Sequence, residues 1–183
     1  MTTTQQFLDE YGTSNIEANQ SPEKFKDIIF SFLNGIQLAM REPHPFEPYH
    51  KAIREPFDYY KWGNDFMKPL IILDQSILRG EQNFKKISEC IGKGENVVIL
   101  SNHQTEADPQ VISVLLEKYG IHELAEKIVY IAGHKVTSDP IAIPFSMGRD
   151  LLCIHSKKHI KNPPELIGVK QAQNLATMKV SLV

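Results

Sequence analysis

The hydrophobic pattern changes its period near residue 94, and this change limits the possible folds more than any other feature of the chain. Before that point, apolar residues recur every three or four positions, as on one face of an amphipathic helix. After it, short apolar runs alternate with helical segments. Strands that alternate with helices form parallel sheets through right-handed crossovers. The sequence therefore predicts an α/β protein, with a small N-terminal helical domain followed by a parallel-sheet domain.

The first part of the chain is expected to form three helices, over residues 21–41, 58–77 and 81–91. The first should start at Ser21 and Pro22, a favourable N-cap and N1 pair, and should end at the prolines that follow it. The second should be kinked at Pro69. In the third, one apolar stripe should face the core, formed by Phe84, Ile87 and Ile91.

The second part is expected to contain three strands, over residues 96–100, 128–132 and 151–155. Each is a continuous apolar run, which is typical of a strand buried on both faces. A helix that opens at Pro109 should connect the first two strands. We place the domain boundary after the second helix, which gives domains of residues 1–78 and 79–183.

The composition excludes several classes of protein. The 20 Lys and Arg residues nearly balance the 22 Asp and Glu residues, so a nucleic-acid partner is not expected. No apolar run approaches the length of a membrane span, and the first residues resemble neither a signal nor a transit peptide. The two cysteines, Cys90 and Cys153, are expected to be free buried thiols in a cytoplasm-like compartment.

The segment SNHQTEADP, residues 101–109, lies between the first expected strand and the helix that follows it. Active sites of open parallel sheets gather at such carboxyl ends of strands. The Asp108 carboxylate can accept a hydrogen bond from one imidazole nitrogen of His103. The other nitrogen is then free to accept a proton from an alcohol. The pair thus predicts a general base and the residue that orients it.

The same spacing recurs in His134 and Asp139, which also follow an expected strand and precede a proline. Each aspartate could instead be an N-cap, because Asp before Pro is a favoured helix start. From spacing alone, both interpretations stay open for Asp108, and the N-cap is favoured for Asp139.

A basic run, residues 157–161, follows the third expected strand. Lysine and histidine donors that converge can bind a phosphate group. The residue types alone favour the simpler interpretation, which is a solvated charged loop.

From Phe57 to about Lys179 the chain resembles the soluble, plastid- and chlamydial-type glycerol-3-phosphate 1-acyltransferases. The similar stretches are PFDYYKWGNDFMKPLI, NVVILSNHQTEADPQVISVLLEK, SDPIAIPFSMGRDLLCIHSKKHI and PELIGVKQAQN. NHQTEADP is that family's form of the HxxxxD acyltransferase motif. The resemblance implies that His103 deprotonates the sn-1 hydroxyl of glycerol 3-phosphate and that Asp108 orients His103. It also implies that Lys158 and His159 bind the substrate phosphate.

The resemblance further implies that acyl carrier protein or acyl-CoA donates the acyl group, in the first step of phospholipid synthesis. No metal or organic cofactor is expected, and contact with membranes should be peripheral at most. The location should be the cytoplasm, or the plastid stroma in a plant. The family continues beyond this chain, so we expect a C-terminally truncated form. His134 and Lys135 stand where the family more often has Asp-Arg, so the resemblance assigns them no role.

Two alternatives to an acyltransferase stay open. One is a metal-dependent hydrolase with His103, Glu106 and Asp108 as ligands, although a single histidine with two carboxylates is a thin ligand set for zinc. The other is a non-catalytic fragment that binds a carrier protein or another partner through its helical domain.

Overall fold

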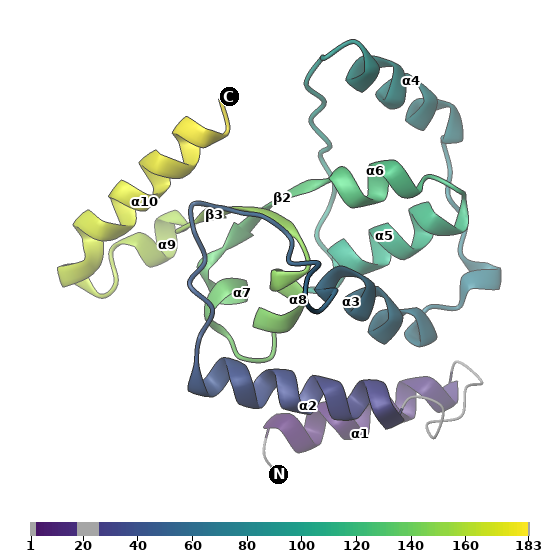
Figure 1. Ribbon diagram of the computed structural model, residues 1–183, viewed down its shortest axis with the longest axis horizontal. Helices are drawn as coiled ribbons and strands as arrows, with labels where there is room; N and C mark the ends of the chain where they lie inside the picture. The colour runs from purple at the N-terminus through teal and green to yellow at the C-terminus, as the bar shows by residue number, and fades with distance from the viewer. Residues whose placement is uncertain (1–2, 18–25, 183) are drawn as a thin grey trace.

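A computed structural model describes residues 3–17 and 26–182 of the chain (Figure 1). Its longer helices are α1 (Thr3–Glu17), α2 (Lys26–Arg41), α3 (Tyr59–Met67), α4 (Glu81–Gly92), α5 (Asp108–Lys118) and α10 (Ile167–Val180). Shorter helices are α6 (His122–Lys127), α7 (His134–Ser138), α8 (Ile143–Met147) and α9 (Lys157–Ile160). Single 3₁₀ turns span Lys68–Leu70, Leu73–Gln75 and Pro164–Leu166. The strands are β1 (Tyr49–His50), β2 (Val129–Gly133) and β3 (Asp150–Ile154).

The strands form one small sheet in the order β1-β3-β2. As predicted, β2 and β3 are parallel, and their register runs from Val129 opposite Asp150 to Gly133 opposite Ile154. The sequence did not predict β1, which pairs antiparallel with β3. Along β3 only alternate residues are buried, so the expectation of burial on both faces was wrong.

The strand predicted over residues 96–100 is absent, and the segment is extended and unpaired. Its apolar side chains lie in solvent, with Val98 82% and Leu100 92% exposed. A strand exists only where a neighbouring strand pairs with its backbone, and none of the described residues does so here. The predicted crossover between this segment and β2 is therefore absent too, and the parallel connection that exists runs from β2 through α7 and α8 to β3.

The helix predictions around residues 21–41 and after Pro109 are confirmed by α2 and α5. Ser21 and Pro22 lie outside the described residues. The core-facing side of α2 is as expected, with Phe32 and Ile36 buried.

The helix predicted over residues 58–77 is much shorter. Asp58 caps α3 by accepting a hydrogen bond from the Lys61 backbone N–H at 2.9 Å. The α-helix ends at Met67, and a 3₁₀ turn follows instead of a kinked helix. Proline has no N–H and its ring clashes with the preceding turn, so Pro69 ends the helix.

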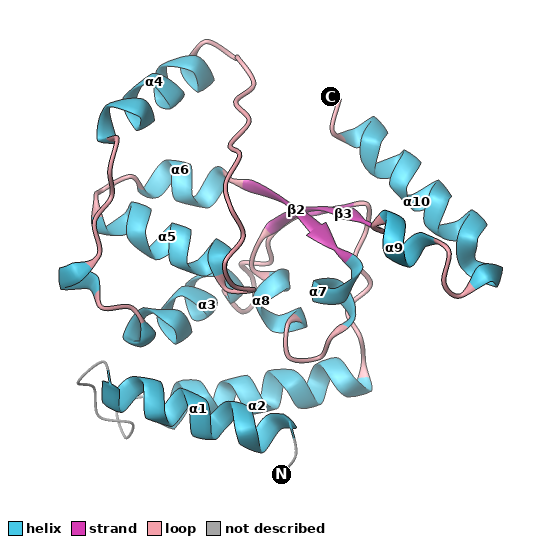
Figure 2. Cartoon of the chain, turned by 180° about the vertical axis from the view of Figure 1, so that it is seen from behind, coloured by secondary structure: helices cyan, strands magenta, loops and turns pink. Residues whose placement is uncertain are grey.

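The predicted helix over residues 81–91 is confirmed by α4, but its expected burial is wrong. Phe84 and Ile87 are only half-buried, and Ile91 is 39% exposed. Figures 1 and 2 show α4 beyond α6, joined to the rest of the chain by two extended segments, and none of its residues is buried by the described part of the chain. Cys90 lies on this helix and is half-buried, whereas Cys153 on β3 is buried as expected.

The main core brings helices from both halves of the chain together. Its buried residues are Tyr11, Phe32, Ile36, Trp62 and Phe66, from α1, α2 and α3. Phe145 of α8 packs against them, with its ring centroid 4.9 Å from that of Trp62. The division into domains of residues 1–78 and 79–183 stays a prediction.

A second, smaller core lies at the sheet, where Ala132, Leu151 and Cys153 are buried. Gly148 allows β3 to start close to α3, because a Cβ atom there would lie 2.5 Å from the carbonyl carbon of Tyr59. None of the helices within residues 3–17 and 26–182 has the length and hydrophobicity needed to cross a bilayer.

Candidate active site

His103 and Asp108 meet in the loop that leads into α5. The Nδ1 atom of His103 lies 2.7 Å from Oδ2 of Asp108. The same carboxylate accepts hydrogen bonds from the backbone N–H groups of Gln104, at 2.9 Å, and Thr105, at 3.1 Å. Both N–H groups precede Asp108 in the chain, and the N-cap residue of α5 is Ala107. Asp108 therefore holds the loop and the histidine, and it does not cap the helix.

The hydrogen bonds to Asp108 favour its charged form. Burial raises the pKa of this carboxyl, but the bonds from His103 and from the two backbone N–H groups outweigh that effect. The pKa of Asp108 consequently lies below its usual value. A charged carboxylate favours a proton on Nδ1 of His103, which leaves Nε2 as the acceptor. The histidine side chain is 70% exposed, so Nε2 is accessible to a substrate.

His103 and Asp108 border a cavity of about 860 Å³. Most of its surface is apolar, and its walls include Phe66, Ile112, Ile131 and Phe145. Apolar cavities with a few polar groups are typical of small-molecule sites. The arrangement places a proton acceptor beside a space that suits a hydrocarbon chain.

The second motif with the same spacing is arranged differently. Its residues 134–138 form α7, and no hydrogen bond joins His134 to Asp139. Oδ1 of Asp139 instead accepts from the Ile141 backbone N–H at 2.9 Å, at the turn that leads into α8. The His134 ring lies against that of His155, with 4.8 Å between the centroids. The N-cap favoured for Asp139 was wrong, because the N-cap residue of α8 is Ala142 and Asp139 instead holds the turn between α7 and α8.

Glu106 does not join His103 and Asp108. Its Oε1 atom accepts a hydrogen bond from Nζ of Lys135 at 2.9 Å, in an exposed ion pair between the loop and α7. Within the described part of the chain, no three His, Cys, Asp or Glu side chains are grouped so that they could hold a metal ion. The geometry gives no support to the metal-dependent hydrolase.

Lys158 and His159 lie on α9, just beyond β3, and both are exposed. Neither contributes to the lining of the cavity beside His103. The structure thus brings the predicted general base and its orienting residue together, but it does not bring the predicted phosphate ligands into the same cavity.

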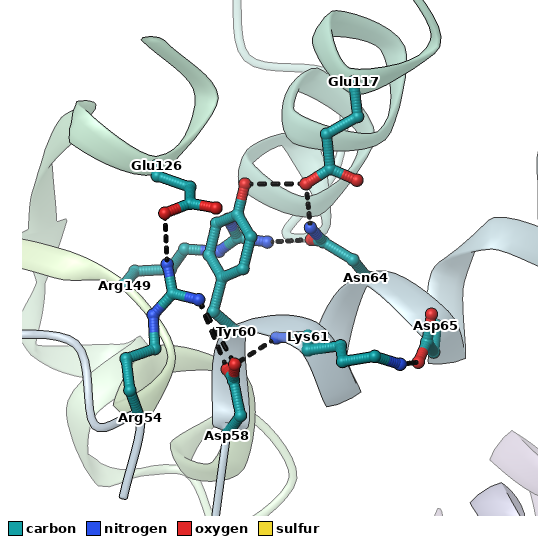
Figure 3. A network of polar contacts seen from close by, with 9 residues as sticks. All are labelled: Arg54, Asp58, Tyr60, Lys61, Asn64, Asp65, Glu117, Glu126 and Arg149. Atoms are coloured by element: carbon teal, nitrogen blue, oxygen red, sulfur yellow. Dashed lines mark hydrogen bonds and ion pairs between the residues drawn. The ribbon is translucent and has the colours of Figure 1, made fainter. Parts of the chain in front are cut away.

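Sequence reasoning missed Arg149, which lines the cavity and is only 3% exposed. Its guanidinium donates to Ser113 Oγ at 2.7 Å and to Asn64 Oδ1, and it lies 4.4 Å from the ring centroid of Tyr60. Glu117 accepts from Tyr60 Oη at 2.9 Å and from Asn64 Nδ2 at 3.0 Å (Figure 3). Burial lowers the pKa of Arg149. This network ties α3 and α5 to the start of β3 and fixes one wall of the cavity.

Comparisons with known proteins show which family this chain resembles. A chloroplastic glycerol-3-phosphate acyltransferase of Cucurbita moschata is 48% identical over 147 residues, which cover 80% of this chain and 33% of the relative. One of Spinacia oleracea is 46% identical over 147 residues, 80% of this chain and 31% of the relative. One of Arabidopsis thaliana is 44% identical over 142 residues, which cover 78% of this chain and 31% of the relative.

The chain spans about a third of the length of these curated relatives. The model of the family described as Acyltransferase matches residues 76–179, which is more than half of the chain and includes the His103–Asp108 loop, the cavity wall at Arg149 and the basic run. On this evidence, the chain belongs to the acyltransferase family.

Proposed function

We propose that the protein transfers a fatty acyl group from an acyl thioester to the sn-1 hydroxyl of glycerol 3-phosphate. The observation that carries this proposal is the 2.7 Å contact between His103 Nδ1 and Asp108, with Nε2 left accessible beside an apolar cavity. The relatives are named glycerol-3-phosphate acyltransferases, which supports the same acceptor.

In the proposed reaction, Nε2 of His103 accepts the proton of the hydroxyl as its oxygen attacks the thioester carbonyl carbon. Asp108 stabilises the imidazolium that forms. The carbon–sulfur bond then breaks, and the imidazolium returns the proton to the departing thiolate. The products are a 1-acyl glycerol 3-phosphate and a free thiol. A general base of this kind contributes about 10²- to 10⁴-fold in rate.

Lys158 and His159 are the proposed ligands of the acceptor's phosphate. Both are exposed cationic or protonatable side chains on α9, and neither Lys158 nor its neighbours Lys157 and Lys161 forms an ion pair with a described residue. Unpaired donors can bind a phosphate by charge-assisted hydrogen bonds. The donor is an acyl group on acyl carrier protein or on coenzyme A, and the reaction would begin phospholipid synthesis.

The relatives are named as chloroplastic proteins. For this protein we propose the plastid stroma, with the cytoplasm as the alternative. Imaging of the tagged protein in its source cells would distinguish the two compartments.

A hybrid protein tests the activity. The matching part of this chain would replace the corresponding 147 residues of the Spinacia oleracea relative. We expect the hybrid to transfer labelled acyl groups to glycerol 3-phosphate, from at least one of the two donors, and not to glycerol. The unchanged relative is the positive control. A folded hybrid that transfers no acyl group, or one whose activity is abolished by a metal chelator while the relative's is not, would contradict the proposal.

A further inference from the structure

Four cationic or protonatable side chains gather beyond the carboxyl ends of β2 and β3. His134 directly follows β2 and His155 directly follows β3, and these neighbouring strands are parallel. The two imidazole rings lie 4.8 Å apart between centroids. His159 on α9 and Lys170 on α10 lie close enough to His134 to interact with it electrostatically, and they complete the group, which we call the histidine–lysine cluster. Figure 2 shows α7 and α9 leaving the same end of the two strands.

Lys170 brings a buried positive charge to this cluster. It is 7% exposed, and its Nζ donates to the backbone carbonyl oxygens of His159, at 3.0 Å, and Asn162. Neither acceptor is charged, and no carboxylate of a described residue forms an ion pair with Lys170. Buried charges in proteins are usually paired. The ammonium therefore fixes the turn that presents His159 and leaves a net positive charge there.

His155 is the second unusual member of the cluster. It is 7% exposed, its Nε2 lies 3.0 Å from Gln173 Oε1, and its Nδ1 has no hydrogen-bond partner among the described residues. Buried polar atoms are nearly always hydrogen-bonded. An unpaired buried imidazole nitrogen marks a place where a further polar group would bind favourably.

The groups around His134 also create a positive electrostatic environment. Burial lowers the pKa of His134, and the charges of His155, Lys170 and His159 lower it further. Among the described residues, no acidic group opposes them. On its own helix, the neighbouring Lys135 is neutralised by Glu106, so it does not offset the effect. A cluster of cationic groups without a counter-ion is a site for an anion.

We propose that His134 is a further ligand of the substrate phosphate, and that it binds this group together with His159 in its imidazolium form. The inference rests on the proposed function and deepens it, because it adds a protonation-dependent ligand to the acceptor site. A doubly charged phosphate binds an imidazolium by charge-assisted hydrogen bonds, which neutral imidazole cannot match. Affinity is therefore highest where His134 is protonated, and falls as the pH rises through the pKa of His134 in the complex.

Binding of inorganic phosphate and of glycerol 3-phosphate to the 183-residue protein would test this, by calorimetry from about pH 5.5 to pH 8.5. The variants are His134→Asn and His134→Lys, and the control is His122→Asn, since His122 is also an exposed first residue of a short helix. At about pH 6 we expect His134→Asn to bind both ligands about fivefold more weakly than the unchanged protein. The difference should vanish at high pH, and His122→Asn should bind normally.

Dividing the wild-type affinity by the variant affinity at each pH cancels the ionisation of the phosphate ligand itself, which also titrates within this pH range. His134→Lys keeps a charge at all these pH values, so it should bind as tightly as the protonated wild type and lose the pH dependence due to residue 134. Nuclear magnetic resonance gives a check without a variant, because added phosphate should raise the pKa of His134.

Equal affinities of wild type and His134→Asn across the pH range, or a His134 pKa that phosphate leaves unchanged, would overturn the inference. If the wild type bound neither ligand, the inference and the proposed acceptor would both fail. If phosphate binding depended on His134 but the hybrid transferred no acyl group, only the proposed function would fail. Thermal unfolding by circular dichroism would show that each variant is folded.

Discussion

Two segments of this molecule share one sequence pattern and differ in what they build. In both, a histidine follows a predicted strand, and an aspartate five positions later precedes a proline. His103 and Asp108 form a hydrogen bond of 2.7 Å. In the second segment, the His134 ring packs against that of His155, and Asp139 accepts a hydrogen bond from the Ile141 backbone N–H. Spacing therefore tells which residues can meet, and the backbone between them decides whether they do.

The intervening residues explain the difference. Between His103 and Asp108 the chain is a loop whose N–H groups turn toward the carboxylate. Between His134 and Asp139 it is the helix α7. Residues five positions apart on a helix are rotated by roughly 140° from each other, so their side chains leave on different faces. A histidine and aspartate at this spacing can pair across a loop, but not along a helix.

The largest expected difference between the two segments is in the rate of acyl transfer. In the hybrid protein, His103→Ala should lower kcat by at least about 100-fold, because the acceptor hydroxyl loses its base. His134→Ala should leave kcat within about threefold, since it would act on phosphate binding and therefore on KM. Steady-state kinetics with saturating donor measures both. A greater loss of kcat in His134→Ala would reverse the roles of the two motifs.

Substitution of the aspartates should also lower kcat more at Asp108 than at Asp139, but the loss should be smaller than for His103→Ala. Asp108→Asn keeps the size of the side chain but removes the charge that stabilises the imidazolium, so kcat should fall about tenfold to 100-fold. Asp139→Asn can still accept the Ile141 N–H bond, and its kcat should be nearly unchanged. Comparable losses in the two variants would show that the Asp108 charge has no special part in the reaction.

The basic run beyond β3 should affect binding of one substrate only. Lys158→Ala and His159→Ala should each raise KM for glycerol 3-phosphate about tenfold in the hybrid, with KM for the acyl donor unchanged. Lys93→Ala, which removes an exposed lysine after α4, is a control that should change neither value. A rise in KM limited to the donor would instead assign the run to docking of the donor.

The smallest expected effect is at the ion pair that links the two segments. Glu106 in the first loop and Lys135 on α7 are both exposed, with side chains 57% and 73% accessible. Exposed pairs contribute at most about 1 kcal/mol. A double-mutant cycle with Glu106→Gln and Lys135→Gln, measured by denaturant unfolding, should give a coupling below that value. A larger coupling would mean that this contact holds the loop in place.

Sequence reasoning predicted the features that depend on local pattern. The stripe on α2, the helix after Pro109 and the parallel pairing of β2 with β3 all follow from periodicity and chain order. The contact between His103 and Asp108 follows from spacing in a short loop. These features involve residues close in the chain, or strands whose order the crossover rule restricts.

The features that were missed depend on residues far apart in the chain. The apolar run at residues 96–100 has the composition of a buried strand, but no described strand pairs with it, and Leu100 is 92% exposed. Arg149 shows the opposite case, because a charged residue is buried by Asn64, Tyr60 and Ser113 from three distant positions. Composition shows what a segment could bury, while burial itself requires a partner that the local sequence does not reveal.

The central claim is that Asp108 holds His103 with a proton on Nδ1 and an unprotonated Nε2. The ring nitrogens of His103 can be observed directly by nuclear magnetic resonance of the ¹⁵N-labelled protein at a pH where the imidazole is neutral. We predict the Nδ1–H tautomer for His103 in the unchanged protein, and a loss of that preference in Asp108→Ala. A neutral His103 with its proton on Nε2 would contradict the account, because that nitrogen could not accept the proton of the substrate hydroxyl.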